Sequence, residues 1–170
     1  MRNLPPRSVL LLSVDPARAS DIYVLVLTAI QRSGSVGILV VTIRPYAWWA
    51  KIAKEKGLDL ERIRFVNCVE KLETSEDPNV RHTGIEDLDS TREVISEFVS
   101  AEPPEHTVVV LDSPTAIRFY HSEKETEEFV FWFKTQIDKW GVRGLIIYPG
   151  SACPELLEHI LGLVDRRAVI

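Results

Sequence analysis

Four short, largely apolar runs constrain what this 170-residue chain can fold into. They are rich in valine, isoleucine and leucine, and they cover residues 8–14, 37–43, 107–111 and 142–148. A run without alternating polar residues predicts a strand that is covered on both faces. Because such strands occur in parallel sheets with helices on each side, the runs predict an α/β fold with three αβα layers around a mainly parallel sheet.

Amphipathic stretches between these runs predict the helices, and local signals predict where they begin and end. The expected N-terminal caps are Ser20, Ser90 and Ser122, and the expected helix ends are Gly34, Gly57 and Gly141. Further helices are predicted at residues 45–56 and 154–163, whereas the polar residues 70–84 predict a surface loop. Weaker runs at 63–66 and 167–170 bring the predicted sheet to five or six strands, within a single domain of residues 1–170.

The composition argues against several classes of function. A formal net charge of −5 and a pI near 5.4 give no field that would attract nucleic acid or an anionic membrane, so neither partner is expected. Cys68 and Cys153 lack CxxC spacing and paired histidines nearby, so no metal site is expected. Since no leader-like or membrane-spanning apolar segment occurs, a cytoplasmic location is expected. The chain has only five asparagine and glutamine residues, which favours a thermophilic source.

Three segments, taken in order, resemble the RecA/KaiC-like family of P-loop ATPases. Residues 37–45 and the phrase LDLERIRFVNCVEK at residues 58–71 are similar to a strand, a proline-started helix and the next strand of KaiC-like domains. The phrase VVVLDSPTAI at residues 108–117 resembles the family's Walker B strand, and residues 156–170 resemble its closing helix and strand. The resemblance spans residues 8–170 and implies a RecA-like fold in a degenerate, archaeal-type member of the family.

The turn at which such an ATPase carries its P-loop departs from the family pattern. Residues 13–21 read SVDPARASD and contain no glycine, although a P-loop needs glycines so that successive backbone N–H groups can wrap phosphate. By the resemblance, Ala19 stands where the lysine belongs and Ser20 where the Mg²⁺-binding hydroxyl belongs. Pro16 removes a further backbone donor, because proline has no N–H group. The Walker A signature is therefore absent.

The water-activating glutamates that the family carries after its second strand are also missing. Residues 42–45 read TIRP, and Arg44 cannot act as a general base near neutral pH because it keeps its proton. Only Asp112, the Walker B-like acid, remains in register. Since phosphoryl transfer needs a phosphate cradle, a metal and a water-orienting group together, no ATP hydrolysis is expected.

These departures predict a non-catalytic RecA/KaiC-like domain that acts as an interaction or regulatory module. Its expected partner is a second copy of the chain or a related, active ATPase. No cofactor is expected under this hypothesis. The alternative is a protein that holds ATP or ADP with Mg²⁺ through Arg18, Ser20 and Asp112 and senses the nucleotide without turnover.

Two further interpretations concern the carboxyl ends of the strands. Asp112 could hold Mg²⁺ through water, but capping of the loop at residues 113–115 by its carboxylate is favoured. A small enzyme of another doubly wound family is a third hypothesis, because ligands bind at the carboxyl ends of parallel strands. Its site would be formed by Asp15, Arg44, Asp112 and Tyr148.

Aromatic residues mark candidate interaction surfaces. Tyr46, Trp48 and Trp49 follow Arg44 on one predicted helix, where adjacent side chains point about 100° apart. One tryptophan is therefore expected to stay partly exposed and to contact a partner, and burial of both in a wide helix face is the alternative. Residues 129–133, FVFWF, pose the same question, since such a helix either packs on two sides or forms an interface.

Overall fold

The computed structural model describes residues 4–69, 77–150 and 153–170, and these residues form one seven-stranded sheet. All neighbouring strands are parallel, and their order is β4-β3-β2-β5-β6-β1-β7. The strands are β1 (Val9–Val14), β2 (Val36–Val41), β3 (Ile63–Asn67), β4 (Val80–His82), β5 (Thr107–Asp112), β6 (Arg143–Pro149) and β7 (Arg166–Val169). The parallel α/β architecture predicted from the apolar runs is therefore confirmed.

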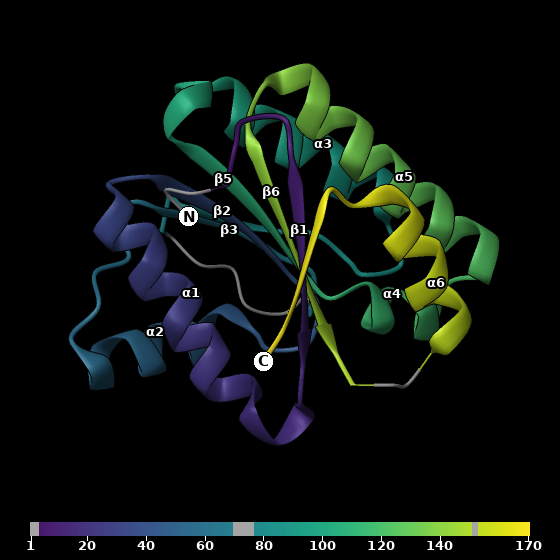
Figure 1. The fold of residues 1–170 in the computed structure, drawn as a ribbon. Coiled ribbons are helices and arrows are strands. Elements are labelled where there is room, and N and C mark those ends of the chain that lie inside the picture. The colour runs from purple at the N-terminus through teal and green to yellow at the C-terminus, as the bar shows by residue number, and fades with distance from the viewer. Residues whose placement is uncertain (1–3, 70–76, 151–152) are drawn as a thin grey trace.

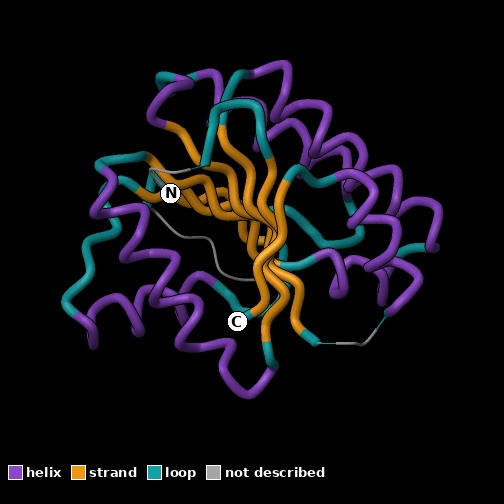
Figure 2. Tube along the Cα trace, in the orientation of Figure 1, coloured by secondary structure: helices purple, strands orange, loops and turns teal. Residues whose placement is uncertain are grey.

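Helices cover both faces of this sheet. α1 and α2 lie on one face, whereas α3, α4, α5 and α6 lie on the other (Figure 1). The helices are α1 (Ala19–Ser33), α2 (Tyr46–Lys56), α3 (Leu88–Ser100), α4 (Pro114–Tyr120), α5 (Glu123–Trp140) and α6 (Pro154–Leu163). Figure 2 shows the strands enclosed between these two helical layers. In the described ranges, no helix is both long and apolar enough to span a membrane.

The core consists of two apolar clusters, one on each face of the sheet. Phe129 and Phe133 of α5 belong to the cluster beneath α3, α5 and α6, and Tyr23 and Trp49 belong to the cluster beneath α1 and α2. β2 and β5 are buried along their whole length because both clusters contact them. Each fully buried large apolar side chain contributes about 1.5–3 kcal/mol. Residues 129–133 pack mainly inward, although Phe131 remains 58% exposed.

The predicted number of five or six strands is wrong, since the sheet has seven. β4 was expected to be part of a surface loop at residues 70–84, but its three residues pair with β3, so that Phe65 lies opposite Val80. Residues 70–76 of that expected loop lie outside the described residues. A three-residue strand is too short to show periodicity, so its pairing with β3 decides its conformation. The same reason explains why the seven-residue α4 was missed.

The three glycines predicted to end helices do so, whereas only one of the three serines predicted as N-terminal caps acts as a cap. Gly34, Gly57 and Gly141 each adopt the left-handed conformation at a helix C-terminus. Ser122 caps α5 in a complete capping box with Glu125. Ser90 and Ser20 lie inside their helices instead: α3 is capped by Asp87, whose carboxylate accepts the Ser90 N–H, and α1 begins at Ala19 directly after a 3₁₀ turn.

Ser122 and Ser90 provide a matched pair for a stability test. Ser122→Ala removes the hydroxyl that accepts the Glu125 N–H, so we expect it to lower the free energy of unfolding by about 1 kcal/mol. Ser90→Ala, in a similar S-x-x-E context, is expected to change it by less than about 0.5 kcal/mol, because Asp87 provides that cap. Urea unfolding of both variants measures the difference. Equal losses would show that the α5 capping box contributes nothing specific.

Candidate functional site

The carboxyl ends of four central strands meet at one edge of the sheet. Val41, the last residue of β2, lies opposite Asp112, the last residue of β5, and Asp112 lies opposite Ile147 of β6. β1 ends beside β6, with Val14 opposite Pro149. Ligands of parallel α/β sheets bind outside this edge. Asp112 and the turn after β1 both lie there.

The turn after β1 is closed on itself. Asp15 Oδ1 accepts the Ala17 N–H (2.9 Å), the Asp15 carbonyl accepts the Arg18 N–H (2.8 Å), and the Ala19 N–H reaches the Pro16 carbonyl. The Asp15 N–H donates to the Ile170 carbonyl (3.3 Å), and Pro16 has no N–H. All backbone donors from residue 15 to residue 19 are thus used inside the protein.

This turn does not fit a triphosphate. An anion cradle consists of successive N–H groups that point at the ligand, and here those groups are satisfied by a 3₁₀ turn and an aspartate side chain. Gly150 packs directly against the turn, because a Cβ atom at that position would lie 3.0 Å from Pro16 Cγ. The adjoining hollow of about 360 Å³ is lined mainly by apolar residues, and its two charged lining residues are Asp15 and Arg167. No step of ATP chemistry can be derived from this arrangement.

Asp112 is sealed beneath α1 rather than open to a ligand. Its side chain is only 1% exposed, and Oδ1 accepts a hydrogen bond from the Tyr23 hydroxyl at 3.0 Å. Oδ2 is also buried and has no hydrogen-bond partner among the described residues. The expected capping of residues 113–115 by this carboxylate is wrong, because the Thr42 hydroxyl accepts the Ser113 N–H instead (2.7 Å). Asp112 therefore connects β5 to α1.

Burial changes the acid strength of this carboxyl group. Removal from water raises the pKa of Asp112 to about 7, although the Tyr23 hydroxyl and the charge of Arg44 act in the opposite direction. Burial also raises the pKa of Tyr23, and the neighbouring Asp112 adds to that rise. A substantial fraction of Asp112 is consequently neutral at neutral pH. Mg²⁺ prefers ionised carboxylates, so its binding here would require Asp112 to release its proton.

Aromatic side chains from α1 and α2 close the space above Asp112. The Tyr23 ring contacts both tryptophans of α2, with centroids 5.6 Å from Trp48 and 4.8 Å from Trp49. The guanidinium group of Arg44 lies 5.5 Å from the Trp48 ring centroid on the outer side. The residue that contacts Asp112, Tyr23, is thus itself packed against two rings. Sequence reasoning missed Tyr23, because only the tertiary structure brings residue 23 to residue 112.

The candidate interaction residues separate into one core residue and three surface residues. Trp49 is completely buried, which excludes it from a partner contact in the folded protein and corrects its inclusion in that set. Trp48 is half-buried, so the expectation that one tryptophan stays partly exposed is confirmed. Arg44 is exposed, and the half-buried Tyr46 donates its hydroxyl hydrogen to Asp77 Oδ2 at 3.0 Å.

The other sequence-predicted groups do not converge. Arg18 and Ser20 are exposed at the start of α1, whereas Asp112 is buried beneath it. Tyr148, proposed for an unrelated enzyme site, is buried and donates its hydroxyl hydrogen to the Cys153 carbonyl. Asp15 is engaged in its own turn. Within the described ranges, no three acidic, histidine or cysteine side chains are grouped so that they could hold a metal ion.

Comparison with solved structures supports the fold class of this chain. The chain is similar to a KaiC-like protein from the hyperthermophilic archaeon Pyrococcus horikoshii, with a TM-score of 0.73 and 15% identity over 98% of this chain and 73% of the other. It is also similar to an uncharacterized protein from Pyrococcus horikoshii solved in complex with an unknown peptide, with a TM-score of 0.68 and 13% identity over 96% and 77% of the two chains. The fold is therefore RecA/KaiC-like. The sequence matches no protein-family model and no curated protein sequence.

Proposed function

We propose that this chain is a non-catalytic RecA/KaiC-like domain that acts as an interaction or regulatory module. The observation that carries the proposal is the closed turn after β1, where every backbone donor from residue 15 to residue 19 is satisfied internally. An ATPase of this fold needs those donors for phosphate. Asp112, the acid that would approach the metal, is covered by Tyr23 and buried.

Two observations support a binding role: the packed fold itself and a peptide complex of a similar protein. The fold has a well-packed apolar core on both faces of the sheet. The peptide held by one of the similar solved structures is consistent with a binding role for this fold. The expected partner is a related, active ATPase or another copy of the chain. Light scattering of the purified protein, alone and with a candidate partner, measures either association.

The nucleotide question is tested directly by thermal unfolding. We expect no rise in Tm when ATP or ADP is added at 5 mM with Mg²⁺, because the turn after β1 offers the phosphates no free backbone donors. Ligand at about a hundredfold excess over Kd stabilises by about 2.7 kcal/mol, which corresponds to a Tm rise of about 5–10 °C for a chain of this size. An active RecA-type ATPase serves as the positive control.

The rival hypothesis makes the opposite prediction for the same experiment. If Arg18 and Ser20 held nucleotide at the start of α1, Tm would rise with nucleotide concentration, and Arg18→Ala would remove most of that rise. Phosphate release measured in parallel separates holding from turnover. A concentration-dependent rise that Arg18→Ala abolishes would replace the proposal with nucleotide sensing, and ATP cleavage lost in Asp112→Asn would restore an enzyme.

A further inference from the structure

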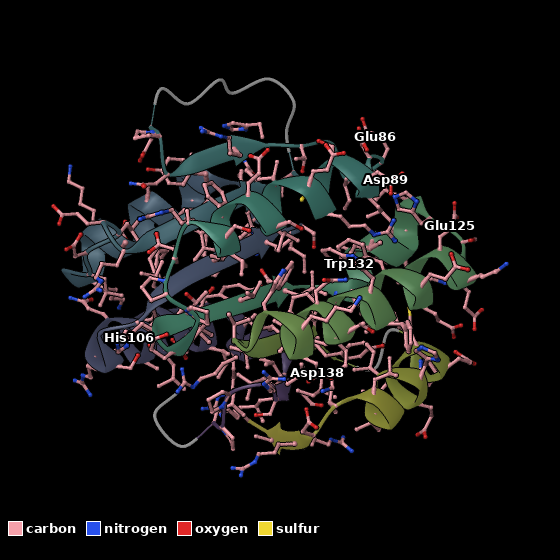
Figure 3. All side chains as sticks on the ribbon, turned by 90° about the horizontal axis from the view of Figure 1, so that it is seen from above. Glu86, Asp89, His106, Glu125, Trp132 and Asp138 are labelled. Atoms are coloured by element: carbon pink, nitrogen blue, oxygen red, sulfur yellow. The ribbon has the colours of Figure 1, made fainter. Side chains whose placement is uncertain are left out.

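β7 is an edge strand whose outer side pairs with no other strand of the described chain. It lies last in the strand order and pairs with β1 alone. The opposite edge, β4, has three residues, whereas β7 has four, and most of them are exposed. Figure 3 shows the C-terminal segment, in yellow, along one margin of the molecule. An edge strand presents a row of N–H and C=O groups to which another extended segment can bind.

Arg167 and Val169 direct their backbone groups away from the sheet. Ile170, directly after β7, uses both of its groups toward β1: its N–H donates to the Ser13 carbonyl (3.0 Å), and its carbonyl accepts the Asp15 N–H (3.3 Å). Successive residues of a strand direct these groups to opposite sides, so those of Val169 and Arg167 point outward. Two N–H donors and two carbonyl acceptors are thus available to a further strand.

The side chains beside these backbone groups supply a charge and an apolar surface. Arg167 is exposed and forms no ion pair or hydrogen bond with a described residue, and Val169 is 73% exposed. Both line the hollow of about 360 Å³ beside the turn after β1, together with Leu157 of α6. The hydroxyl oxygen of Ser13, another lining residue, is buried without a hydrogen-bond partner in the described ranges. A ligand of β7 would therefore meet a cation next to an apolar hollow.

The acidic groups around β7 are engaged with the protein itself. Asp165, directly before β7, pairs with Lys134 of α5 at 3.1 Å. Lys134 also binds Asp138, labelled in Figure 3, at 2.9 Å. Asp15, the acid of the hollow, accepts a backbone N–H of its own turn at 2.9 Å. Arg167 is consequently a cation without a paired carboxylate in the part of the chain that the structure describes.

We propose that β7 receives an extended, acidic segment of a partner protein as an additional antiparallel strand. The backbone of the segment bonds to Arg167 and Val169, a carboxylate of the segment pairs with the Arg167 guanidinium group, and an apolar side chain packs on Val169 at the hollow. In strand addition, main-chain hydrogen bonds give affinity and alternate side chains give specificity. The proposal rests on the function proposed above and deepens it, because it names the chemistry of the partner.

Charge favours an acidic strand over a second copy of the chain. In a two-fold antiparallel pairing centred on Ala168, the Arg167 residues of the two copies would be diagonal neighbours, and β7 also carries Arg166. Like charges at this spacing oppose pairing, and charged residues on an edge strand commonly protect it from self-association. An acidic strand removes this repulsion, because guanidinium and carboxylate groups form bidentate pairs. A nucleic acid also carries negative charge, but its backbone lacks the alternating N–H and C=O groups of a strand.

Four labelled nonapeptides test the proposal by fluorescence anisotropy. The first has threonine at odd positions and alternates glutamate with valine at even positions, and the second carries lysine in place of glutamate. We expect only the first to bind, with an affinity that falls as NaCl is raised from about 50 to about 300 mM. The other two are N-methylated versions of the first. Methylation at the valines removes donors that face β7 and should abolish binding, whereas methylation at two threonines, whose N–H groups face away, should leave it intact.

Variants of β7 test the same contacts from the side of the protein. Val169→Pro removes an outward N–H that the fold does not use, and Arg167→Gln removes the unpaired charge. Each should weaken binding of the first peptide at least about threefold. The melting curves of both variants should match the wild type, because proline is tolerated at such edge positions. Val169→Thr, which keeps the N–H, and Lys54→Gln, which removes an exposed charge from α2, should bind nearly as the wild type does.

Equal binding of the two N-methylated peptides, or unchanged binding in both Val169→Pro and Arg167→Gln, would overturn the proposal. So would a wild-type dimer that Val169→Pro converts to a monomer, because β7 would then pair with a second copy. None of these results would alter the nucleotide titration, which tests the proposed function separately.

Discussion

Replacing Trp49 by alanine is expected to lower the free energy of unfolding by about 3–5 kcal/mol, the largest loss we anticipate for any single residue of α2. Its side chain is completely buried and contacts Tyr23, Trp48 and Phe65. Truncation leaves a cavity between α2 and the sheet that the rigid strands cannot refill. Denaturant unfolding, followed by far-UV circular dichroism, measures the loss.

The neighbouring tryptophan is the control for this experiment. Trp48→Ala is expected to cost only about 1–2 kcal/mol, because Trp48 is half-buried and keeps one side toward Arg44 and solvent. Trp49→Phe should recover much of the loss, since it refills most of the volume and removes an Nε1–H that is buried without a hydrogen-bond partner among the described residues. Similar losses for Trp48→Ala and Trp49→Ala would contradict the placement of the two rings.

Asp112→Asn is expected to stabilise the protein at pH 8 but not at pH 4. The ordinary pKa of an aspartate is 3.8, and burial raises the pKa of Asp112 in the folded protein to about 7. Between these two values the folded state holds a proton that the unfolded state has released, so wild-type stability falls as pH rises through this window. Asparagine resembles the neutral carboxyl group and does not titrate. Since a tenfold difference in proton affinity is worth about 1.4 kcal/mol, the gain at pH 8 is on the order of 4 kcal/mol.

Unfolding free energies of wild type and Asp112→Asn at several pH values between 4 and 8 measure this effect. Glu55→Gln, which removes an exposed carboxylate from α2, controls for the change in net charge. Tyr23→Phe provides a second check: it removes the hydroxyl that favours the ionised form, so the loss of stability should extend to higher pH. Stability curves of wild type and Asp112→Asn that run parallel from pH 4 to pH 8 would exclude a neutral, buried Asp112.

These two predictions concern the same part of the molecule. Tyr23 joins them, because it contacts Trp49 through its ring and Asp112 through its hydroxyl. The side chains around Asp112 are packed and hydrogen-bonded as a core. The aromatic packing therefore contributes to stability and leaves Asp112 almost without exposure to a ligand. This is the physical basis for proposing a binding module rather than a catalyst.

Local sequence signals were sufficient for much of the architecture. The largely apolar runs predicted β1, β2, β5 and β6, because burial on both faces favours apolar side chains along the length of a strand. Glycines predicted three helix ends, since the left-handed conformation there strains residues with a Cβ atom. The absence of glycine and lysine from residues 13–21 was likewise evident without coordinates.

Other features depended on which segments the sheet order brings together. Tyr23 meets Asp112 across 89 positions of sequence, and the three-residue β4 is held by its pairing with β3. Periodicity reports only whether a residue belongs to an apolar face, so it could not decide that Trp49 is buried while Trp48 reaches the surface. Burial and hydrogen bonding between distant segments arise only when the whole sheet has formed, because the free energy of those contacts belongs to pairs of residues rather than to any single stretch of chain.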